Sequence, residues 1–478
     1  MKDFSLKRTK IVATLGPATS DLQTIKELII AGVNVFRLNF SHGTAEEHRQ
    51  RANYIREAMK TLHTQVGIIA DLQGPKIRIG AFKAGKIELR QGQTFILDAD
   101  FDLDQGDQTQ VGIAYKNLPK DVQSGDQLLL DDGRVVFTVE KIEDNKIYCK
   151  VKAGTVLSSH KGINKFGGGL SAEALTEKDK ADLLTAISIE ADYIAISFPR
   201  NAADMHYARK LMHAAGGNAG LIAKIERAEA MQATDEIINA SDAVMVARGD
   251  LGVEIGDAAL PAAQKHIIQR ARALNKAVIT ATQMMESMIE NNIPTRAEVF
   301  DVANAVLDYT DAVMLSAETA TGKHPVEVVK AMARICIGAE NQPGAITSKH
   351  RVECFFEKND EAIAMAAIYA ANHSSVKAVI SLTASGDTPL QMSRLKTGIP
   401  IFAFSEKEKT LRKICLYRDV YPIPFSLENK DHNNIYDAMV VTLKQHDLVA
   451  SGDNVLITCG DFVGKRGSTN TLKMMVVA

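Results

Sequence analysis

The chain of 478 residues is longer than one ordinary hydrophobic core and predicts roughly two to four domains. Its 56 Lys and Arg residues against 58 Asp and Glu give a formal net charge of -2, which excludes bulk attraction to nucleic acid or to an anionic membrane. The five cysteines lack paired spacing, and we find neither a signal-like apolar start nor a run of roughly 18 apolar residues. We therefore expect a cytoplasmic protein with reduced thiols and with no nucleic-acid or membrane partner.

Eight short apolar runs, each followed by a helical pattern, organise most of the chain. They span residues 10–16, 34–40, 66–72, 193–198, 221–226, 243–251, 277–284 and 312–319. Near-continuous apolar strands that alternate with helices are typical of a parallel sheet covered on both faces, and eight such units can close into a (β/α)8 TIM barrel. We assign residues 1–75 and 166–342 to this α/β barrel.

The alternation is interrupted between the third and fourth runs. Residues 76–165 show period-two patterns and a hairpin turn at Asp132-Gly133, which predict an inserted β-barrel lid domain. The catalytic mouth of such a barrel lies at the carboxyl ends of its strands, so an insertion there is placed to cover a site. After a helix and a linker (342–350), residues 350–478 alternate again and predict a separate open α/β domain with a regulatory role.

Polar side chains follow most of the predicted barrel strands. Beginning with strand two, we single out Arg37, Asn39, Ser41, Asp71, Lys224, Glu226, Arg248, Asp250, Thr282 and Ser316. A strand-end cap is the preferred interpretation for Thr282 or Ser316 alone, but the set as a whole predicts one mouth lined with cations and acids.

The carboxylates and cations of this set indicate a class of chemistry. Glu226 and Asp250 offer the hard oxygen ligands that Mg²⁺ accepts, and Lys224 shares a face with Glu226. The turn that opens at Gly249 and Asp250 presents N–H groups to a carboxylate or a phosphate. Cations beside such ligands indicate phosphoryl transfer or enolate chemistry, because both spread negative charge.

The motifs resemble the pyruvate kinase family along the whole chain. They are, in order, VFRLNFSHG, GPKIRIG, LLLDDG, HKGINK, LTEKDKADL, AKIE, VMVARGDLGVEI, ITATQMMESM, PTRAEVFDVANAV and MLSAETATGKHPVE. The resemblance implies a barrel with a β lid and a C-terminal α/β domain. It also implies a homotetrameric phosphotransferase that uses Mg²⁺, or Mn²⁺ in its place, to convert phosphoenolpyruvate and ADP into pyruvate and ATP in the last step of glycolysis.

Site roles follow from the resemblance by position. Glu226 and Asp250 would bind the Mg²⁺, Arg37 would pair with the phosphoryl group, and Lys224 would offset charge on that group and on the enolate. The backbone of Gly249 and Asp250, with Thr282, would hold the substrate carboxylate. Because a hydroxyl is too weak an acid to give up its proton outright, Thr282 would relay a proton to the enolate together with Ser316 and water. The nucleotide-side contacts would be Asn39, His42, Arg78 and Lys161.

Lys76 is the main departure from the pattern of better-known relatives. In family members that require K⁺, the ion lies on groups that match Asn39, Ser41, Asp71 and the backbone of Leu72, and Glu stands at the position of Lys76. A Gly-Pro turn after Asp71 can fold the chain so that Lys76 lies near that carboxylate. We expect the Lys76 ammonium to substitute for K⁺, so that K⁺ is not required. The alternative is a solvated surface lysine.

A phosphate site is predicted in the C-terminal domain. Thr383, Ser385, Gly386 and Thr388 lie between a predicted strand and helix, where a phosphate pocket and a capped turn are about equally good interpretations. The resemblance favours an activator pocket, faced by a loop (464–471) that contains Gly467 and Ser468. Asp387 stands where many relatives have Arg, which argues against fructose 1,6-bisphosphate. The stretches NKFGGGLSAEALTEKDKADL and GVEIGDAALP resemble the bacterial class of the family that answers to AMP or sugar monophosphates, so we expect activation by one of these.

Two other functions compete with this assignment. Another Mg²⁺-dependent barrel enzyme of enolpyruvate chemistry, such as an aldolase or a phosphoenolpyruvate mutase, would need neither ADP nor a lid. A non-catalytic sugar-phosphate sensor could keep the fold without the activity, although the intact set Lys224, Glu226, Asp250 and Thr282 argues against it.

Overall fold

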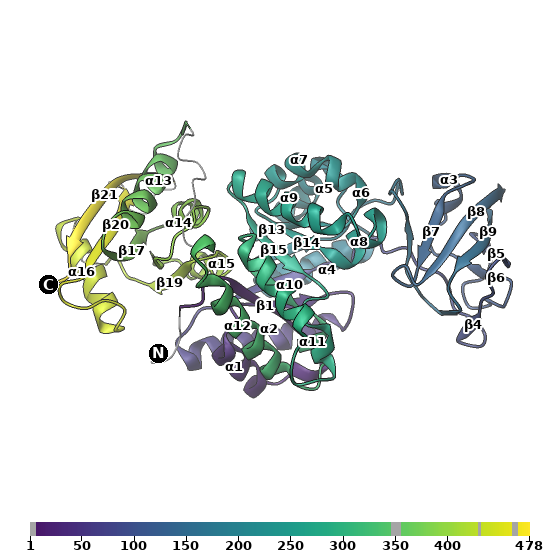
Figure 1. Ribbon diagram of the computed structural model, residues 1–478, viewed down its shortest axis with the longest axis horizontal. Helices are drawn as coiled ribbons and strands as arrows, with labels where there is room; N and C mark the ends of the chain where they lie inside the picture. The colour runs from purple at the N-terminus through teal and green to yellow at the C-terminus, as the bar shows by residue number, and fades with distance from the viewer. Residues whose placement is uncertain (1–5, 346–354, 429–431, 461–466) are drawn as a thin grey trace.

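The computed structural model describes residues 6–345, 355–428, 432–460 and 467–478. Its three parts lie in a row, with the barrel in the centre, the β lid at one end and the C-terminal domain at the other (Figure 1). No helix among these residues is both long and apolar enough to cross a membrane.

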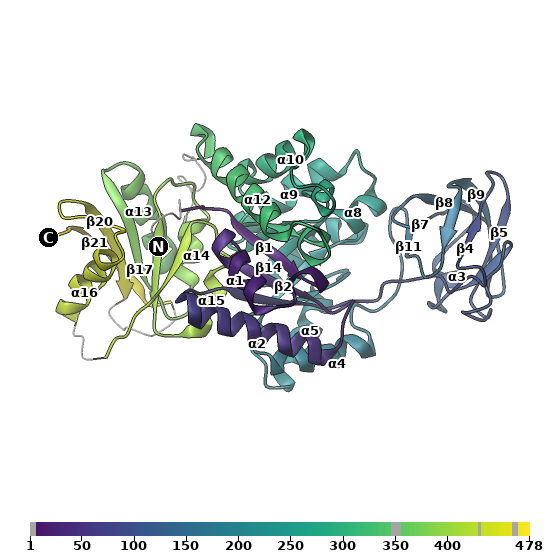
Figure 2. The ribbon, with the colours of Figure 1, turned by 90° about the horizontal axis from the view of Figure 1, so that it is seen from below.

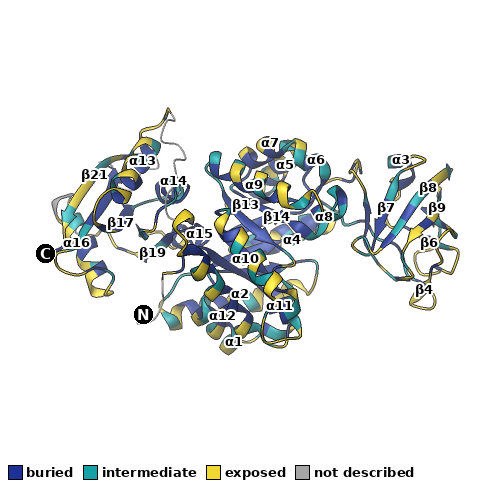
Figure 3. Ribbon diagram, in the orientation of Figure 1, coloured by how far each residue is buried: buried dark blue, intermediate teal, exposed yellow. Residues whose placement is uncertain are grey.

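The centre is a closed parallel barrel with the spatial order β1-β16-β15-β14-β13-β12-β3-β2. All eight predicted strands are confirmed, as β1 (Lys10–Leu15), β2 (Val35–Asn39), β3 (Gly67–Asp71), β12 (Tyr193–Ile196), β13 (Gly220–Ile225), β14 (Ala243–Ala247), β15 (Ala277–Ala281) and β16 (Ala312–Leu315). Nearly every strand residue is buried, as expected for a sheet covered on both faces (Figure 3).

Three of these strands end three or more residues before the predicted boundary; one is β16, which ends at Leu315 because Ala317 begins a short helix. β14 ends at Ala247 because Arg248 begins a helix, and β15 ends at Ala281 because Thr282 and Gln283 adopt positive φ. In both places the backbone leaves the strand at the rim of the barrel, and the polar residues Arg248 and Thr282 lie where it turns.

Helices surround the barrel (Figure 2). Thr44, Thr176 and Thr295 are the N-caps of α2, α4 and α10, and each is paired reciprocally with an acid three residues on. The helices are α1 (Leu22–Ala31), α2 (Ala45–Leu62), α4 (Glu177–Ser188), α5 (Ala202–Ala214), α6 (Ala228–Gln232), α7 (Thr234–Ala240), α8 (Arg248–Ile255), α9 (Leu260–Ala273), α10 (Arg296–Leu307), α11 (Ala317–Ala320) and α12 (Pro325–Glu340), with 3-10 turns η1 (Pro17–Thr19) and η2 (Glu286–Ile289).

The lid contains a six-stranded sheet in the order β11-β7-β8-β9-β5-β6 and a separate pair, β10-β4. Its hairpin turn joins β7 to β8, where Gly133 N–H donates to the carbonyl of Leu130. Asp131, Asp132 and Gly133 all have positive φ, which agrees with the predicted Asp-Gly turn. The elements are β4 (Lys86–Glu88), β5 (Thr94–Asp98), β6 (Gln110–Gly112), α3 (Leu118–Asp121), β7 (Gln127–Leu130), β8 (Val135–Glu143), β9 (Lys146–Ala153), β10 (Val156–Ser158) and β11 (Ile163–Lys165).

The lid meets the barrel where β11 approaches α8. Glu254 of α8 is buried, and its carboxylate accepts the Ala228 N–H at 2.9 Å and the Asn164 side-chain amide at 3.4 Å. The Gly167 N–H donates to the Glu254 carbonyl at 2.9 Å. Burial raises the pKa of the Glu254 carboxyl to about 7. We refer to these contacts of Glu254 with Asn164, Gly167 and Ala228 as the lid seat.

The C-terminal domain has a five-stranded sheet in the order β19-β18-β17-β20-β21, in which only β21 is antiparallel. Of the predicted linker, Pro343–Ala345 form a short 3-10 turn (η3) and residues 346–350 lie outside the described residues. The elements are α13 (Asn359–Asn372), β17 (Val376–Leu382), α14 (Asp387–Ser393), β18 (Ile401–Ser405), α15 (Glu408–Ile414), β19 (Val420–Pro424), α16 (His432–Gln445), β20 (Asn454–Gly460) and β21 (Thr469–Val476).

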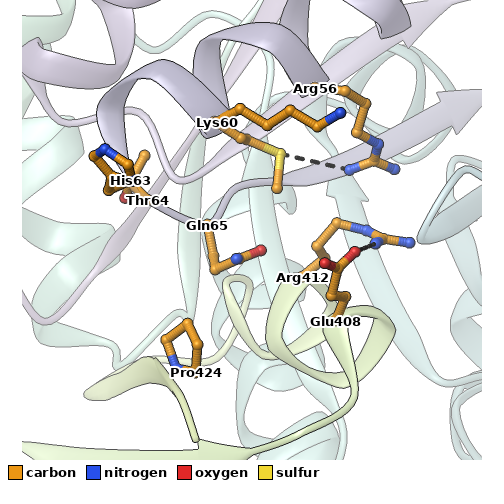
Figure 4. A pocket seen from close by; sticks show the side chains of 9 residues that line it. Arg56, Lys60, His63, Thr64, Gln65, Glu408, Arg412 and Pro424 are labelled. Carbon is orange, nitrogen blue, oxygen red and sulfur yellow. Dashed lines mark hydrogen bonds and ion pairs between the residues drawn. The ribbon is translucent and has the colours of Figure 1, made fainter.

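The C-terminal domain packs against the amino ends of the barrel strands, opposite the mouth. Arg394 and Asp311 form an ion pair there, and both side chains are fully buried. A cavity of about 290 Å³ lies at the same joint, between the end of α2 and α15 (Figure 4). Arg56 and Arg412, which line it, both face the buried carboxylate of Asp192, at 3.7 and 2.9 Å.

Candidate active site

The buried centre of the mouth is an ion-pair network from β2, β3 and β13. Arg37 Nε lies 2.6 Å from Asp71 Oδ2, and Lys224 Nζ lies 3.3 Å from Asp71 Oδ1. Lys224 Nζ also lies 2.9 Å from Glu226 Oε1. The strand register explains the assembly, because β3 lies between β2 and β12, and β12 pairs in turn with β13.

Charge stabilisation outweighs burial for Lys224 and Asp71, whereas burial raises the pKa of the Glu226 carboxyl. Burial tends to lower the pKa of the Lys224 ammonium, but the carboxylates of Asp71 and Glu226 outweigh it and raise that pKa above its ordinary value. Burial tends to raise the pKa of Asp71, but Lys224 and Arg37 outweigh it and lower that pKa. Two permanent cations thus face the mouth from a buried, low-dielectric position, where they act strongly on a nearby anion.

Glu226 and Asp250 have the donor chemistry for a divalent cation. Glu226 is 1% exposed at the end of β13, and Asp250 lies in the first turn of α8. Within the described ranges no cluster of three or more His, Cys, Asp or Glu side chains could hold a metal alone. Two carboxylates that leave other positions to substrate and water are what Mg²⁺ accepts, so these residues fit that ion.

Thr282 and Gly249 are in direct contact. The Gly249 N–H donates to Thr282 Oγ1 at 2.8 Å, and that hydroxyl donates to the carbonyl of Ala281 at 2.7 Å. Thr282 has φ of 67°, an unfavourable conformation for a β-branched residue. Arg248 holds this turn: its Nη2 donates to the carbonyl of Thr282 at 2.6 Å. Arg248 therefore supports the mouth from behind rather than adding a cation to it.

Ser316 follows β16 directly, and its backbone N–H is held by the carboxylate of Glu318. Its N–H donates to Glu318 Oε2 at 2.6 Å, and Glu318 Oε1 accepts the N–H of Met285 at 3.2 Å. In the part of the chain that the structure describes, Ser316 Oγ is buried and has no hydrogen-bond partner. Such a hydroxyl is available to a water or a substrate.

Lys76 does not point where the sequence predicted. Its Nζ lies 3.0 Å from Asp250 Oδ1, whereas Asp71 is engaged by Arg37 and Lys224. The expectation that the turn brings Lys76 back to Asp71 is therefore wrong: the Lys76 N–H instead closes a tight turn onto Gly74, and the side chain crosses to α8. Lys76 nevertheless lies at the mouth, with a quarter of its side chain exposed.

The residues predicted to contact the nucleotide come from two places. On the barrel, Asn39 accepts the Ser41 N–H at 3.2 Å, and His42 follows as an exposed residue. On the lid, Arg78 pairs in an isolated bridge with Gly162, next to Lys161, whose Nζ lies 2.7 Å from Asp131 Oδ1. The lid base thus brings Arg78 and Lys161 together.

Sequence reasoning missed three supporting residues in the mouth. Thr14 of β1 accepts from Arg37 Nη1 at 3.1 Å, although we assigned no polar end to strand one. Ser197, after β12, contacts Lys224 Nζ at 2.8 Å. Glu318 was visible only as part of a motif. None carries a signal of its own, because a lone hydroxyl or acid beside a strand is usually a cap.

The predicted phosphate region of the C-terminal domain forms two facing segments. Gly386 N–H donates to Thr383 Oγ1 at 2.9 Å, and Gly386 has φ of 86°. Thr388 Oγ1 and Thr469 Oγ1 lie 2.8 Å apart, which joins this turn to the segment that begins with Gly467 and Ser468. Residues 464–466 of the predicted facing loop lie outside the described residues. Ser385 is partly buried in the turn.

Comparisons with known proteins cover nearly the whole chain. Residues 6–329 match the family model of the pyruvate kinase barrel domain, and residues 361–475 match that of the pyruvate kinase alpha/beta domain. The chain is 55% identical over 476 residues to pyruvate kinase II of Salmonella typhimurium, with 99% of each chain covered. It is 53% identical to a pyruvate kinase of Haemophilus influenzae, which covers 98% of this chain and 97% of the relative. A pyruvate kinase of Thermococcus litoralis is 39% identical, with 98% of each chain covered.

Proposed function

Because the chain belongs to the pyruvate kinase family and is a phosphotransferase, we propose that the mouth described above transfers the phosphoryl group of phosphoenolpyruvate to ADP. The observation that carries the proposal is the buried network of Arg37, Asp71, Lys224 and Glu226. In this proposal the barrel (1–75 and 166–342) is the catalytic unit, 76–165 is the lid and 350–478 is regulatory.

The substrate is bound by groups from three strand ends. Arg37 pairs with the phosphoryl oxygens, while the N–H groups of Gly249 and Asp250 and the hydroxyl of Thr282 hold the carboxylate. The contact between Gly249 N–H and Thr282 Oγ1 supports this role because it places the two groups next to each other; the N–H, which donates to that hydroxyl in the structure, passes to the carboxylate when the substrate binds. Glu226 and Asp250 hold Mg²⁺, or Mn²⁺ in its place. The ion, when bound, supplies positive charge that polarises the substrate oxygens.

Lys224 acts on the reacting atoms. Its ammonium stabilises the negative charge that spreads over the phosphoryl group in flight and over the enolate that remains. Thr282 and Ser316, with water, relay a proton to the enolate carbon, and the buried hydroxyl of Ser316 without a partner among the described residues supports this relay.

The nucleotide binds between the barrel and the lid. Asn39 and His42 contact it from the barrel, and Arg78 and Lys161 contact it from the base of the lid. The isolated bridge between Arg78 and Gly162, the neighbour of Lys161, supports this assignment, because a lid closing on the mouth carries both cations with it.

Lys76 replaces the monovalent cation in this proposal, so that the enzyme needs a divalent ion but not K⁺. The K⁺ position of relatives matches Asn39, Ser41, Asp71 and Leu72, and a permanent cation at the mouth supports the substitution. The structure has Lys76 on Asp250, so the proposal requires the ammonium to turn from that carboxylate to the substrate phosphoryl group.

Regulation and assembly complete the proposal. AMP or a sugar monophosphate binds the pocket of Thr383, Ser385, Gly386, Thr388, Gly467 and Ser468, and the contact between Thr388 and Thr469 supports a closed pocket there. A homotetramer in the cytoplasm is taken from the family.

A coupled assay of ATP formation from phosphoenolpyruvate and ADP tests the proposal. We expect turnover that depends on Mg²⁺, that is indifferent to K⁺ and that rises with AMP or a sugar monophosphate at low phosphoenolpyruvate. Absence of ATP formation would contradict the proposed reaction. Consumption of phosphoenolpyruvate that needs no ADP and yields no ATP would favour the rival enolpyruvate enzymes.

A further inference from the structure

The end of β12 carries no charged residue, yet it touches two of the main groups of the mouth. Ser197 and Phe198 follow the strand directly, and they are 1% and 6% exposed. Ser197 Oγ lies 2.8 Å from Lys224 Nζ and 2.7 Å from the carbonyl of Leu72. The Phe198 N–H donates to Glu226 Oε2 at 2.8 Å.

The direction of these hydrogen bonds is fixed by chemistry. An ammonium can only donate, so Ser197 Oγ accepts from Lys224, and the single proton of the hydroxyl is left for the carbonyl of Leu72. Lys224 has three N–H groups, and its three contacts are Ser197, Asp71 and Glu226. A substrate oxygen that approaches Lys224 must therefore take over one of three occupied N–H groups.

Ser197 is the neutral member of these three contacts. Asp71 and Glu226 set the charge around Lys224, but a carboxylate attracts an ammonium over a range of positions. A hydroxyl anchored to a main-chain carbonyl fixes one donor direction of the ammonium, and this positions the remaining groups.

Ser197 also holds the segment that enters the lid. Leu72, whose carbonyl it binds, lies four residues before Lys76. A Cβ on Gly74 would lie 2.6 Å from Ser197 Cβ, so this segment packs closely against the serine. Ser197, which contacts Lys224, thus also supports residues 72–76, the segment through which the chain enters the lid.

We propose that Ser197 is a positioning residue for phosphoryl transfer, which holds the Lys224 ammonium in register with the substrate through its hydrogen bonds to Lys224 and to Leu72. The inference rests on the proposed role of Lys224. It predicts that the hydroxyl acts on the transition state more than on substrate binding.

The test is Ser197→Ala, which removes the hydroxyl without adding volume. We expect kcat to fall ten- to a hundredfold and the KM for phosphoenolpyruvate to change less than threefold. The affinity for Mn²⁺, measured by titration of the free enzyme, should stay within twofold, because the Phe198 N–H that holds Glu226 belongs to the backbone. In a Lys224→Met background, Ser197→Ala should change the residual rate less than twofold.

A matched control separates positioning from packing. Ser241 is as buried as Ser197, and its hydroxyl donates to the carbonyl of Ile237 at 2.7 Å, at the other end of the barrel. Ser241→Ala should lower the melting temperature about as much as Ser197→Ala and leave kcat unchanged.

Two results would overturn the inference alone: a Ser197→Ala enzyme with kcat within twofold of the unmutated enzyme, or an undiminished loss in the Lys224→Met background. If Lys224→Met itself kept its turnover, both this inference and the proposed role of Lys224 would be wrong.

Discussion

Lys76→Glu should create a K⁺ requirement that the unmutated enzyme lacks. At an effective dielectric near 20, two unit charges about 4 Å apart interact by about 4 kcal/mol, which bounds what a fixed ammonium contributes beside a phosphoryl group. The side chains of the Lys76 and Asp250 pair are 25% and 23% exposed, so water screens them. We reduce the expected effect to about 1.4 kcal/mol or more, which is about tenfold in turnover.

The assay is ATP formation at saturating Mg²⁺ in buffer free of sodium and potassium, repeated with KCl and with tetramethylammonium chloride at matched ionic strength. The Lys76→Glu enzyme should lose at least tenfold without K⁺ and recover with KCl but not with tetramethylammonium. Lys86→Glu makes the same charge change at an exposed position of the lid and should behave like the unmutated enzyme. A rise of tenfold or more with KCl in the unmutated enzyme would refute the reasoning.

Three further predictions concern proton relay, the activator and the lid seat. Thr282→Ala should slow exchange of the pyruvate methyl protons and lower kcat by about tenfold or more; a change confined to KM would show that the relay is wrong. Ser385→Asp should abolish activation by AMP or a sugar monophosphate, because it places a like charge where phosphate binds, and activation that survives would place the activator elsewhere. The pKa of Glu254 is about 7 in the fold and lower in the unfolded chain, so its stability contribution is present below about pH 4.5 and is lost as pH rises through 7. Glu254→Gln should remove up to about 3 kcal/mol of this pH dependence of the unfolding free energy. The measurement is the difference in melting temperature between pH 5 and pH 8. If the melting temperatures of the variant and of the unmutated enzyme changed in parallel with pH, the role of Glu254 in the lid seat would be contradicted.

The barrel could be predicted because each of its strands is recognisable from its own short stretch of sequence. A run such as VGIIADL is too apolar for a surface segment, and eight repeats of the alternation leave few folds. Strand ends were less certain. In the run VMVARGDLGVEI the Gly-Asp pair indicates a turn after the strand, but no local pattern shows that a helix begins already at Arg248.

The charged residues of the mouth could be predicted because charges at the end of buried strands need partners. Ser197 could not, because a serine after an apolar strand has many local partners, and its contacts here come from two other strands. The direction of Lys76 could not either. Its partner, Asp250, lies 174 residues away in the sequence. A Gly-Pro turn shows that the chain bends after Asp71, but it does not show which carboxylate the side chain of Lys76 then reaches.

The central claim is that Lys224 stabilises the phosphoryl group in transfer, and the most direct measurement is the rate of ATP formation by Lys224→Met. Removal of a buried cation from the reacting centre should lower kcat by at least a thousandfold, about 4 kcal/mol, with the melting temperature within a few degrees. Lys276→Met, which removes a partly buried lysine at the opposite end of the barrel, should keep its turnover. A loss of tenfold or less in Lys224→Met, about 1.4 kcal/mol, would contradict the account.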